Sequence, residues 1–402
     1  GIPMFNTTAN IPESEIQMRI QQLQNDMAAA GLDGALLLQN TDLYYFCGTA
    51  QQAHLYIPAE GDPILMVKKS IPRARAESSL KNIVALKSPA QMPDILKAHN
   101  YSAPSVLGME LDVLPVNLYR RYLDLFQDVT VQDCSPMIRK LRAVKSLFEI
   151  DLIRQAAGLA DRMAAFAATV VREGISEIEV AGLLEAEARR LGHQGLIRMR
   201  LWGSELFYGH FMSGWSAAVP SSLVSPTGGS AMSPAFAQGP GMKKIETSEP
   251  ILFDYVFTFK GYLADHTRIY CIGKLPDKLV AAHEAMLKLQ ALIAQEARPG
   301  KATGDIYSLA LDFVKDKGYE NFFMGGDEQR VPFIGHGIGL ELDEFPFLAA
   351  GQQMKLREGM VIALEPKLIF PGQGVVGIEN THLVTQDGLE RLTLFEDAII
   401  TL

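Results

Sequence analysis

The chain has 402 residues, of which 48% are hydrophobic and 21% charged, and its formal net charge at pH 7 is −9. This length exceeds that of most single domains, so we expect two domains and a large buried core. The negative charge argues against a nucleic-acid partner, and no apolar run in the sequence reaches the roughly 18 residues that a membrane span needs.

The amino-terminal residues, GIPMFNTTANIPESE, contain no basic region followed by an apolar core. We therefore do not expect a secretory signal there. The three cysteines, Cys47, Cys134 and Cys271, are odd in number and widely spaced. Such a pattern indicates reduced thiols in a cytoplasmic protein rather than a disulfide framework.

The first third of the chain alternates short helical and strand patterns. Apolar residues at helical spacing predict a helix over Ser14–Ala30 that ends at Gly31. Further helices are expected near Met92–Ala98 and Pro115–Phe126. Strands are expected over Ala35–Leu38, Leu43–Phe46, Leu55–Ile57, Ile64–Val67, Ile83–Leu86, Ser105–Glu110 and Val129–Val131. This alternation predicts a small α/β domain over residues 1–143, with a mostly buried sheet.

A second domain is expected over residues 144–402, after a boundary near Leu141–Val144. Ser146 followed by Glu149 forms a capping box, in which each side chain bonds to the other residue's backbone N–H. This motif predicts the start of a long alanine-rich helix that ends near Arg172.

A weak internal repeat follows the long helix. Residues 172–174 (Arg-Glu-Gly) correspond to residues 298–300 (Arg-Pro-Gly) at an offset of 126. A second capping box, at Ser176, predicts a helix that reaches Leu191. In each copy a helix, a glycine turn and a second helix precede strands, and each half ends in a hairpin with two acids. The repeat indicates two pseudo-symmetric halves.

The segment Leu201–Gly241 has a different composition from its surroundings. It is rich in Gly, Ser and Pro and contains both tryptophans, Trp202 and Trp215. Long loops inside a domain are commonly functional, so we interpret this segment as one wall of a substrate pocket. The alternative is an ordinary ordered surface loop.

A first predicted hairpin carries two aspartates. Its strands flank a turn at residues 260–261 and cover Ile251–Thr258 and Tyr262–Ile272. With that turn, Asp265 pairs across from Val256, which shares a face with Asp254 because side chains alternate along a strand. Both carboxylates are therefore expected to point the same way.

A second predicted hairpin carries two glutamates. Its strands cover Val361–Ile369 and Val375–Thr385, around a turn at Pro371–Gly374. Glu365 and Glu379 lie equidistant from Gly372, so the hairpin sets them opposite each other. Each lies in an apolar run, where a carboxylate is costly unless it is paired or bound to a metal. His336 lies upstream between two glycines.

If the two hairpins meet, four carboxylates and one imidazole converge. Four like charges cannot coexist in a dry site, because their repulsion would protonate some of them. Two divalent cations would cancel the charge, and two metals about 3.5–4 Å apart form a known hydrolytic device. Carboxylates with a single imidazole suit Mn²⁺, Co²⁺, Fe²⁺ or Zn²⁺.

The order and surroundings of these residues resemble a known family. The segments FDY…ADHTR, GHGIGLE, LEP and GIEN are similar to the metal-ligand motifs of the pita-bread metallohydrolases of family M24, which include aminopeptidase P, prolidase, methionine aminopeptidase and the metal-free creatinase. The resemblance assigns the metal ligands to Asp254, Asp265, His336, Glu365 and Glu379. It implies an α/β (α+β) fold, with a creatinase-like N-terminal domain followed by a pseudo-symmetric pita-bread catalytic domain.

The resemblance also implies an activity. A dinuclear hydrolase similar to Xaa-Pro dipeptidase or Xaa-Pro aminopeptidase would cleave a peptide or small amide bond with a hydroxide held between two divalent ions. Asp254 would bind one ion, His336 and Glu365 the other, and Asp265 and Glu379 would bridge them. Glu365 would also act as the general base. Members of this family are often homodimers, so we expect a homodimer here.

The sequence departs from these peptidases at their accessory histidines. Two of those positions are occupied here by Pro332 and Asp343, and no histidine lies between His210 and Asp254. The remaining histidine candidates are His210, His266 and His382. We take His210 and Asp343 as candidate catalytic residues beside Glu365.

The departure at Asp343 changes the expected substrate. An ionised aspartate accepts hydrogen bonds but cannot donate one, and it would repel a substrate carboxylate in a poorly solvated cleft. We therefore expect weak activity on free Xaa-Pro dipeptides and a preference for neutral or cationic substrates. The alternative is a structural role, in which Asp343 caps a turn or pairs with a nearby Lys or Arg.

Two other functional classes stay open. One is an enzyme of the same fold that is not a peptidase: an amidinohydrolase, or a lyase resembling dimethylsulfoniopropionate lyases with Asp343 as the base. The other is a binding protein without activity. A dinucleotide site is not expected at Gly372–Gly377, although the residues match G-x-G-x-x-G, because a strand-like run follows instead of a helix.

Overall fold

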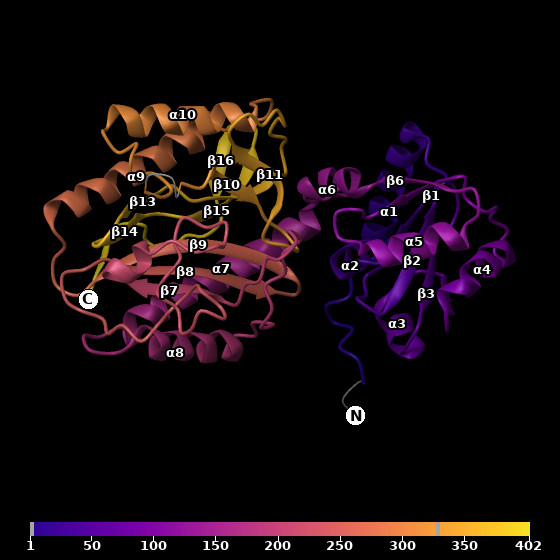
Figure 1. Cartoon of the computed structure of the whole chain (residues 1–402), viewed down its shortest axis with the longest axis horizontal. Helices are drawn as coiled ribbons and strands as arrows, with labels where there is room; N and C mark the ends of the chain where they lie inside the picture. Colours follow the sequence, from indigo (N-terminus) through magenta and orange to yellow (C-terminus); the bar gives the residue numbers. More distant parts are fainter. Residues whose placement is uncertain (1–3, 327–329) are drawn as a thin grey trace. The chain divides into compact units, whose positions relative to one another are not determined.

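A computed structural model of the chain describes residues 4–326 and 330–402 (Figure 1). The chain divides into two compact units, Gly1–Arg142 and Ala143–Leu402. The sequence boundary was expected between residues 143 and 144. Within the described ranges, no helix is long and apolar enough to cross a membrane.

The first unit is built on a mixed six-stranded sheet with the order β4-β3-β2-β1-β5-β6. Strand β2 pairs antiparallel with β1 and β3, and the other neighbours are parallel. The central strands are almost wholly buried, as the apolar runs predict. The strands are β1 (Gly34–Leu37), β2 (Ala53–Pro58), β3 (Ile64–Val67), β4 (Asn82–Ala85), β5 (Val106–Met109) and β6 (Thr130–Asp133).

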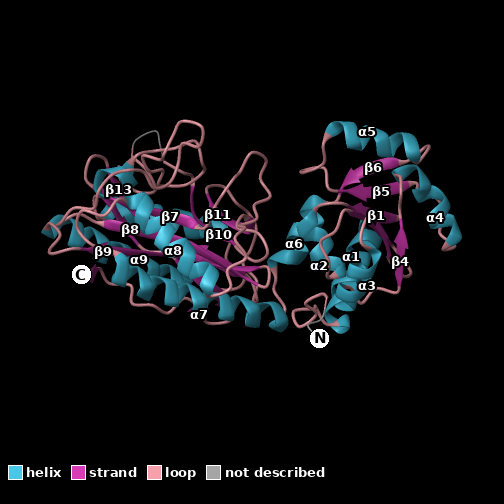
Figure 2. Cartoon of the chain, turned by 90° about the horizontal axis from the view of Figure 1, so that it is seen from below, coloured by secondary structure: helices cyan, strands magenta, loops and turns pink. Residues whose placement is uncertain are grey.

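Helices lie around this sheet (Figure 2). Met92 and Leu96 of α4 and Tyr122 of α5 pack against the sheet in one hydrophobic cluster. The helices predicted over residues 14–30, 92–98 and 115–126 are confirmed, and every end agrees within one residue. The helices of this unit are α1 (Glu13–Ala30), α2 (Asn40–Cys47), α3 (Ile71–Glu77), α4 (Met92–Ala98), α5 (Val116–Leu125) and α6 (Ser135–Ala143). A 3₁₀ turn, η1 (Pro89–Gln91), precedes α4.

The strand predicted over Leu43–Phe46 is wrong, because these residues form the middle of helix α2. The Gln39 side chain accepts a hydrogen bond from the Asp42 N–H at 2.8 Å and caps the start of the helix. Gly48 ends it in the left-handed conformation, with φ of 83°. The aromatic run favours a strand locally, but burial of most of the helix by tertiary packing decides the structure.

The second unit begins with two helices that pack on the sheet β17-β9-β8-β7 (Figure 1). The capping box at Ser146 and Glu149 is confirmed in both directions, with hydrogen bonds of 3.3 and 3.1 Å. Ser176 caps the second helix through the Glu179 N–H at 3.3 Å. The elements are α7 (Leu147–Val170), α8 (Glu177–Arg190), β7 (Gly209–Ser213), the 3₁₀ turn η2 (Gly214–Ala218), β8 (Ile251–Phe259), β9 (Tyr262–Cys271) and β17 (Ile400–Thr401).

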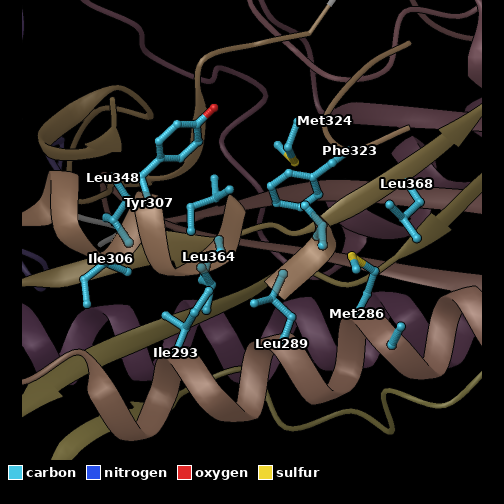
Figure 3. Close-up of a cluster of buried hydrophobic side chains, with 14 of the residues drawn as sticks. Met286, Leu289, Ile293, Ile306, Tyr307, Phe323, Met324, Leu348, Leu364 and Leu368 are labelled. Atoms are coloured by element: carbon cyan, nitrogen blue, oxygen red, sulfur yellow. The ribbon is translucent and has the colours of Figure 1, made fainter. Parts of the chain in front are cut away.

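The later half of this unit repeats the arrangement. Helices α9 (Asp277–Glu296) and α10 (Thr303–Asp316) pack on a sheet with the order β11-β10-β12-β15-β16 and on the pair β13-β14. Figure 3 shows Leu289 and Ile293 of α9 among the buried side chains that join these layers. The strands are β10 (Phe333–Gly337), β11 (Glu344–Ala349), β12 (Val361–Leu364), β13 (Lys367–Phe370), β14 (Gly374–Gly377), β15 (Asn380–Thr385) and β16 (Gly388–Arg391).

The weak sequence repeat corresponds to a structural repeat. The glycine turns after α7 and α9 both adopt positive φ, 86° at Gly174 and 94° at Gly300, which glycine accommodates without strain. The Gly174 N–H donates to the Ile245 carbonyl and the Gly300 N–H donates to the Leu356 carbonyl, both at 2.8 Å. The two halves of the unit therefore use the same helix–turn–helix geometry.

The segment Leu201–Gly241 is not all loop. Residues Gly209–Ser213 form strand β7, which pairs antiparallel with β8. The composition of the segment did not predict this strand, because glycine and serine are abundant there. The strand predicted after the glycine turn at Gly372 is confirmed, because Gly374–Gly377 form strand β14.

A buried carboxylate holds this segment in place. Glu177, which is 0% exposed, accepts hydrogen bonds from the Ser213 N–H at 2.6 Å and the Gly241 N–H at 3.1 Å. The Ser213 and Ser216 hydroxyls donate to the same carboxylate at 3.1 and 3.2 Å. Helix α8 is thereby fastened to strand β7 and to the end of the long segment.

We predict that Glu177→Ala lowers the free energy of unfolding by roughly 2–3 kcal/mol, because two buried backbone N–H groups lose their acceptor. Urea unfolding followed by circular dichroism measures the change. The control is Glu179→Ala, at an exposed position of the same helix, where we expect a loss under about 1 kcal/mol. Equal losses in the two variants would contradict an anchoring role for Glu177.

Candidate metal centre

The first hairpin adopts the predicted register. Asp265 on β9 pairs with Val256 on β8, and Asp254 lies two residues before Val256 on the same strand. Because the side chains of residues two apart point to one face, both carboxylates lie on the same side of the sheet. Asp254 and Asp265 accordingly line one pocket.

The second hairpin also has the predicted register, although it is divided between two sheets. Leu364 pairs with Asn380 in one sheet and Lys367 pairs with Gly377 in the other. Both pairs continue one register, which sets Glu365 opposite Glu379. The regular pairing is interrupted at these two acids, where Glu365 instead donates its N–H to the Ile334 carbonyl at 2.8 Å.

One backbone contact joins the two hairpins. The Thr267 N–H on β9 donates to the Glu379 carbonyl at 3.0 Å, and the two residues form an isolated bridge. The Thr267 hydroxyl donates to Glu379 Oε1 at 3.1 Å. This contact brings the carboxylates of the two hairpins together. The sequence alone did not establish that the hairpins meet.

His336 on β10 completes the group. Its Nδ1 faces the Gly337 carbonyl at 2.9 Å, so we assign the N–H of the neutral ring to Nδ1. Its Nε2 lies 3.2 Å from Glu365 Oε2, 3.7 Å from Asp265 Oδ2 and 3.8 Å from Glu379 Oε2. Burial disfavours the charged ring, but the Glu365 and Glu379 carboxylates raise the pKa of His336 well above its ordinary value. Nε2 therefore needs a positive charge beside it, either a proton or a metal ion among these oxygens.

The electrostatics of the group follow from burial and crowding. Burial, followed by the charges of Glu379 and Asp254, raises the pKa of the Asp265 carboxyl well above its ordinary value. Burial alone would also raise the pKa of the Glu365 carboxyl, but Lys367 and His336 lower it below its ordinary value. Glu365 is therefore more readily kept ionised than Asp265.

The donor set fits a divalent cation. Ligand atoms of Asp265, His336 and Glu379 all lie within 4.8 Å of one another. Asp265 Oδ1 and Glu379 Oε2 are buried and have no hydrogen-bond partner among the described residues. Buried carboxylate oxygens need a partner, and oxygen donors with one imidazole suit a first-row divalent ion.

Sequence reasoning missed one charged group in this site. Lys367 is 0% exposed, and its Nζ lies 3.2 Å from Asp254 Oδ2 and 3.3 Å from Glu365 Oε1. Burial by itself would lower the pKa of this ammonium, but the surrounding carboxylates, led by Asp254, hold it well above the ordinary value. The available signal was a lysine two residues after Glu365 and directly before the apolar residues Leu368–Phe370.

A pocket of about 110 Å³ within the second unit is lined by all five candidate ligands, Asp254, Asp265, His336, Glu365 and Glu379. Leu201, Leu206, Leu223 and Val224 contribute to its wall, so part of the segment Leu201–Gly241 lines the pocket as interpreted from the sequence. The tryptophans do not line it, and Trp202 is 96% exposed. No lysine or arginine belongs to the lining within the described ranges, and most of the remaining wall is aliphatic or aromatic.

His210 is the accessory histidine candidate that reaches the pocket. It lies on β7 directly across from Asp254 on β8. Burial lowers the pKa of its imidazole, and its Nε2 has no hydrogen-bond partner among the described residues. A neutral imidazole can donate one hydrogen bond and accept another, so His210 can bind a polar atom of a ligand.

The other two histidine candidates lie outside the pocket lining. Burial lowers the pKa of His266 and of His382 to about 3 each. His266 packs edge-on against Phe253, and His382 Nδ1 faces the Asn380 carbonyl at 2.9 Å. Both are placed as neutral core residues.

Asp343 lines the pocket, but its oxygens are already engaged. The Arg200 N–H lies 2.8 Å from Oδ1 and 3.0 Å from Oδ2, and the Leu201 N–H donates to Oδ2 at 2.7 Å. These bonds join the start of the long segment to the loop that precedes β11. The geometry favours the structural alternative for Asp343 over a role as a proton-abstracting base.

Comparison with known proteins identifies relatives along almost the whole chain. A model of metallopeptidase family M24 matches residues 151–386, and a model of the creatinase/prolidase N-terminal domain matches residues 19–144. An Xaa-Pro dipeptidase from Pyrococcus furiosus is 27% identical over 384 residues, which are 95% of this chain and 99% of the relative.

Solved structures agree with these matches. An Xaa-Pro dipeptidase from Bacillus anthracis has a TM-score of 0.82 and 26% identity, covering 96% of this chain and all of the other. Aminopeptidase P from E. coli with the inhibitor Pro-Leu has a TM-score of 0.76 over 96% of this chain and 97% of the other, but at 18% identity it supports the fold alone. The expected fold, a creatinase-like domain before a pita-bread domain, is confirmed.

A buried neutral histidine supports strand β8 behind the site. The ring of His193 stacks on Tyr208 with centroids 4.3 Å apart, its Nε2 faces the Val256 carbonyl at 2.9 Å, and its Nδ1 accepts the Gly195 N–H at 2.8 Å. Burial lowers the pKa of this imidazole from 6.5 to about 4. Protonation would remove the acceptor that Gly195 uses.

We predict that His193 makes the fold sensitive to acid. Between pH 6.5 and 4 the unfolded chain binds a proton that the folded chain excludes, so the stabilisation is complete above pH 6.5 and falls as the pH is lowered toward 4. From pH 7 to pH 5, the wild type should lose about 1–2 kcal/mol more unfolding free energy than His193→Gln. Urea titrations at the two pH values measure this difference, and parallel losses would contradict it.

Proposed function

Because the chain belongs to metallopeptidase family M24, we propose that it is a metal-dependent hydrolase of the Xaa-Pro dipeptidase and Xaa-Pro aminopeptidase type. The observation that carries this proposal is the convergence of Asp265, His336 and Glu379 in a pocket that Asp254 and Glu365 also line. The substrate would be a small peptide or amide that enters through the same pocket.

The proposed roles follow the chemistry of each side chain. Asp254, Asp265, His336, Glu365 and Glu379 would hold the divalent metal, which polarises a carbonyl and lowers the pKa of bound water. Glu365, whose pKa is lowered below the ordinary value, would accept the proton of the attacking water and pass it to the leaving amine. The residues suit Mn²⁺, Co²⁺, Fe²⁺ or Zn²⁺.

The resemblance implies two divalent ions. A two-ion arrangement would have to accommodate the Lys367 ammonium, which already lies near Asp254, Glu365 and Glu379. The number of ions is therefore a separate question from the presence of metal.

His210 and Asp343 would act on the substrate side of the pocket. His210 would donate a hydrogen bond from Nε2 to a substrate oxygen, since that nitrogen has no partner among the described residues. Asp343 would position the wall through the Arg200 and Leu201 N–H groups. A lyase with Asp343 as the base is not favoured, because proton abstraction would compete with these bonds.

The lining favours substrates without a carboxylate near Asp343. Apart from the four carboxylates assigned to the metal, the lining contains Asp343 and, within the described ranges, no lysine or arginine to pair with a substrate carboxylate. Bringing a further anion into this pocket costs Coulomb energy. The proposed substrate therefore presents a neutral or cationic group to Asp343.

We predict that kcat/KM for Ala-Pro-amide exceeds that for free Ala-Pro by at least about 10-fold, an effect of roughly 1.4 kcal/mol. Release of alanine from the metal-loaded protein measures both rates and also separates hydrolysis from elimination, which releases an alkene. Glu365→Gln should lower turnover at least about 100-fold with an unchanged circular dichroism spectrum, because it removes the proton acceptor.

Two results would contradict this proposal. Release of an alkene from ammonium or sulfonium propionates, with no amide hydrolysis, would favour the lyase. Free Ala-Pro turned over as fast as its amide would leave the hydrolase in place but remove the proposed exclusion of a substrate carboxylate.

We also propose that the protein works in a reducing compartment such as the cytoplasm, because Cys47, Cys134 and Cys271 are free and buried. The homodimer that the resemblance implies stays a prediction. Light scattering at micromolar protein should give about twice the chain mass of 44.1 kDa. A mass equal to that of a single chain would contradict it.

A further inference from the structure

A lysine side chain lies among the candidate metal ligands. The Nζ of Lys367 is 3.2 Å from Asp254 Oδ2, 3.3 Å from Glu365 Oε1 and 3.6 Å from Glu379 Oε1. An ammonium group is a compact cation with three N–H donors. Its three N–H donors equal in number the three carboxylates around it, and its single positive charge offsets part of their negative charge.

The backbone around Lys367 leaves space for its side chain next to the candidate ligands. Lys367 lies on β13 directly opposite Gly377 on β14. A Cβ atom built on Gly377 would lie 2.7 Å from Lys367 Cα and 3.1 Å from Lys367 Cγ, so only glycine leaves room for the base of the lysine side chain. The complete burial of Lys367 shows that its ammonium does not reach solvent.

The oxygens of the two glutamates are divided between two cation positions. Glu365 Oε2 and Glu379 Oε2 face His336 Nε2, at 3.2 and 3.8 Å. Glu365 Oε1 and Glu379 Oε1 face Lys367 Nζ, at 3.3 and 3.6 Å. Each glutamate thus points one oxygen to the His336 side and the other to the Lys367 side.

We propose that the Lys367 ammonium takes the place of one of the two divalent ions, so that the centre binds a single divalent ion on the His336 side. This inference rests on the proposed metal-dependent function, and it is independent of the substrate. A second ion would need Asp254 Oδ2 and the two Oε1 atoms that the ammonium already contacts, and two cations sharing those oxygens would repel each other.

Because its ammonium takes the place of an ion, Lys367 has a positioning role. Its ammonium holds the Asp254 and Glu365 carboxylates in fixed orientations through N–H donors. It supplies positive charge without an open coordination position. Lys367 therefore orients the proposed proton acceptor, Glu365, from the side opposite His336.

The wild-type protein gives the first test. Protein stripped of metal, reloaded with excess Mn²⁺ and passed over a desalting column should retain about one Mn²⁺ per chain by elemental analysis. Its electron paramagnetic resonance spectrum should be that of isolated Mn²⁺ rather than of an exchange-coupled pair. Two Mn²⁺ per chain with a coupled spectrum would overturn the inference and leave the hydrolase proposal standing.

A variant pair gives the second test. Lys367→Ala should raise the retained Mn²⁺ from about one to about two per chain and produce the coupled spectrum. The control is Lys145→Ala, at another buried lysine of the same unit, whose Nζ pairs with Glu344 Oε1 at 3.1 Å. This control should keep the wild-type stoichiometry and spectrum.

The remaining outcomes are also decisive. If Lys367→Ala does not fold, the wild-type stoichiometry and spectrum decide the inference alone. A folded Lys367→Ala that still retains one isolated Mn²⁺ would show that the ammonium displaces no ion. One retained Mn²⁺ in the wild type without amide hydrolysis would support the inference and remove the proposed function, whereas no retained metal would overturn both.

Discussion

The charge of four buried carboxylates is the constraint on which the second unit depends. Asp254, Asp265, Glu365 and Glu379 come from two hairpins and lie within a few ångströms of one another around His336 and Lys367. Such a group is stable only when positive charge lies among the oxygens. The chain supplies one such charge itself, in Lys367, and the ligand atoms of Asp265, His336 and Glu379 lie close enough together to hold a metal ion.

The pseudo-symmetric fold explains how these acids meet. Each half presents a hairpin in front of a helix pair, and the Thr267–Glu379 bridge fixes one hairpin against the other. The acids of each hairpin share a face because of strand alternation alone. The site then requires only that the two halves pack together, which the large hydrophobic cluster around α9 and α10 supports on one side.

Two further carboxylates shape the pocket without belonging to the metal centre. Glu177 and Asp343 both accept backbone N–H groups from the segment that lines the pocket, at its end and at its beginning. N–H bonds to a buried carboxylate offset part of the cost of its burial. The wall of a small, mostly apolar cavity is thereby held in one conformation beside the reacting groups.

The candidate ligands could be found from the sequence because the information is local. The register of each hairpin follows from its turn, so Val256 opposite Asp265 and Glu365 opposite Glu379 could be predicted by counting. Capping boxes gave the starts of α7 and α8 in the same way. The strand predicted from the short aromatic run at Leu43–Phe46 is wrong, because burial of helix α2 overrides the local preference for a strand.

Only the tertiary structure revealed the contacts between residues that are far apart in the chain. The three carboxylates around Lys367 come from β8 and from both arms of the second hairpin, so their joint approach to one ammonium has no signature in a single window. The N–H groups that engage Asp343 belong to residues more than a hundred positions earlier. The sequence by itself determined which residues could bind a metal, through alternation and turn geometry. Only the packing of the two halves brought Lys367 against carboxylates of both hairpins, because that approach depends on distances between strands rather than along them.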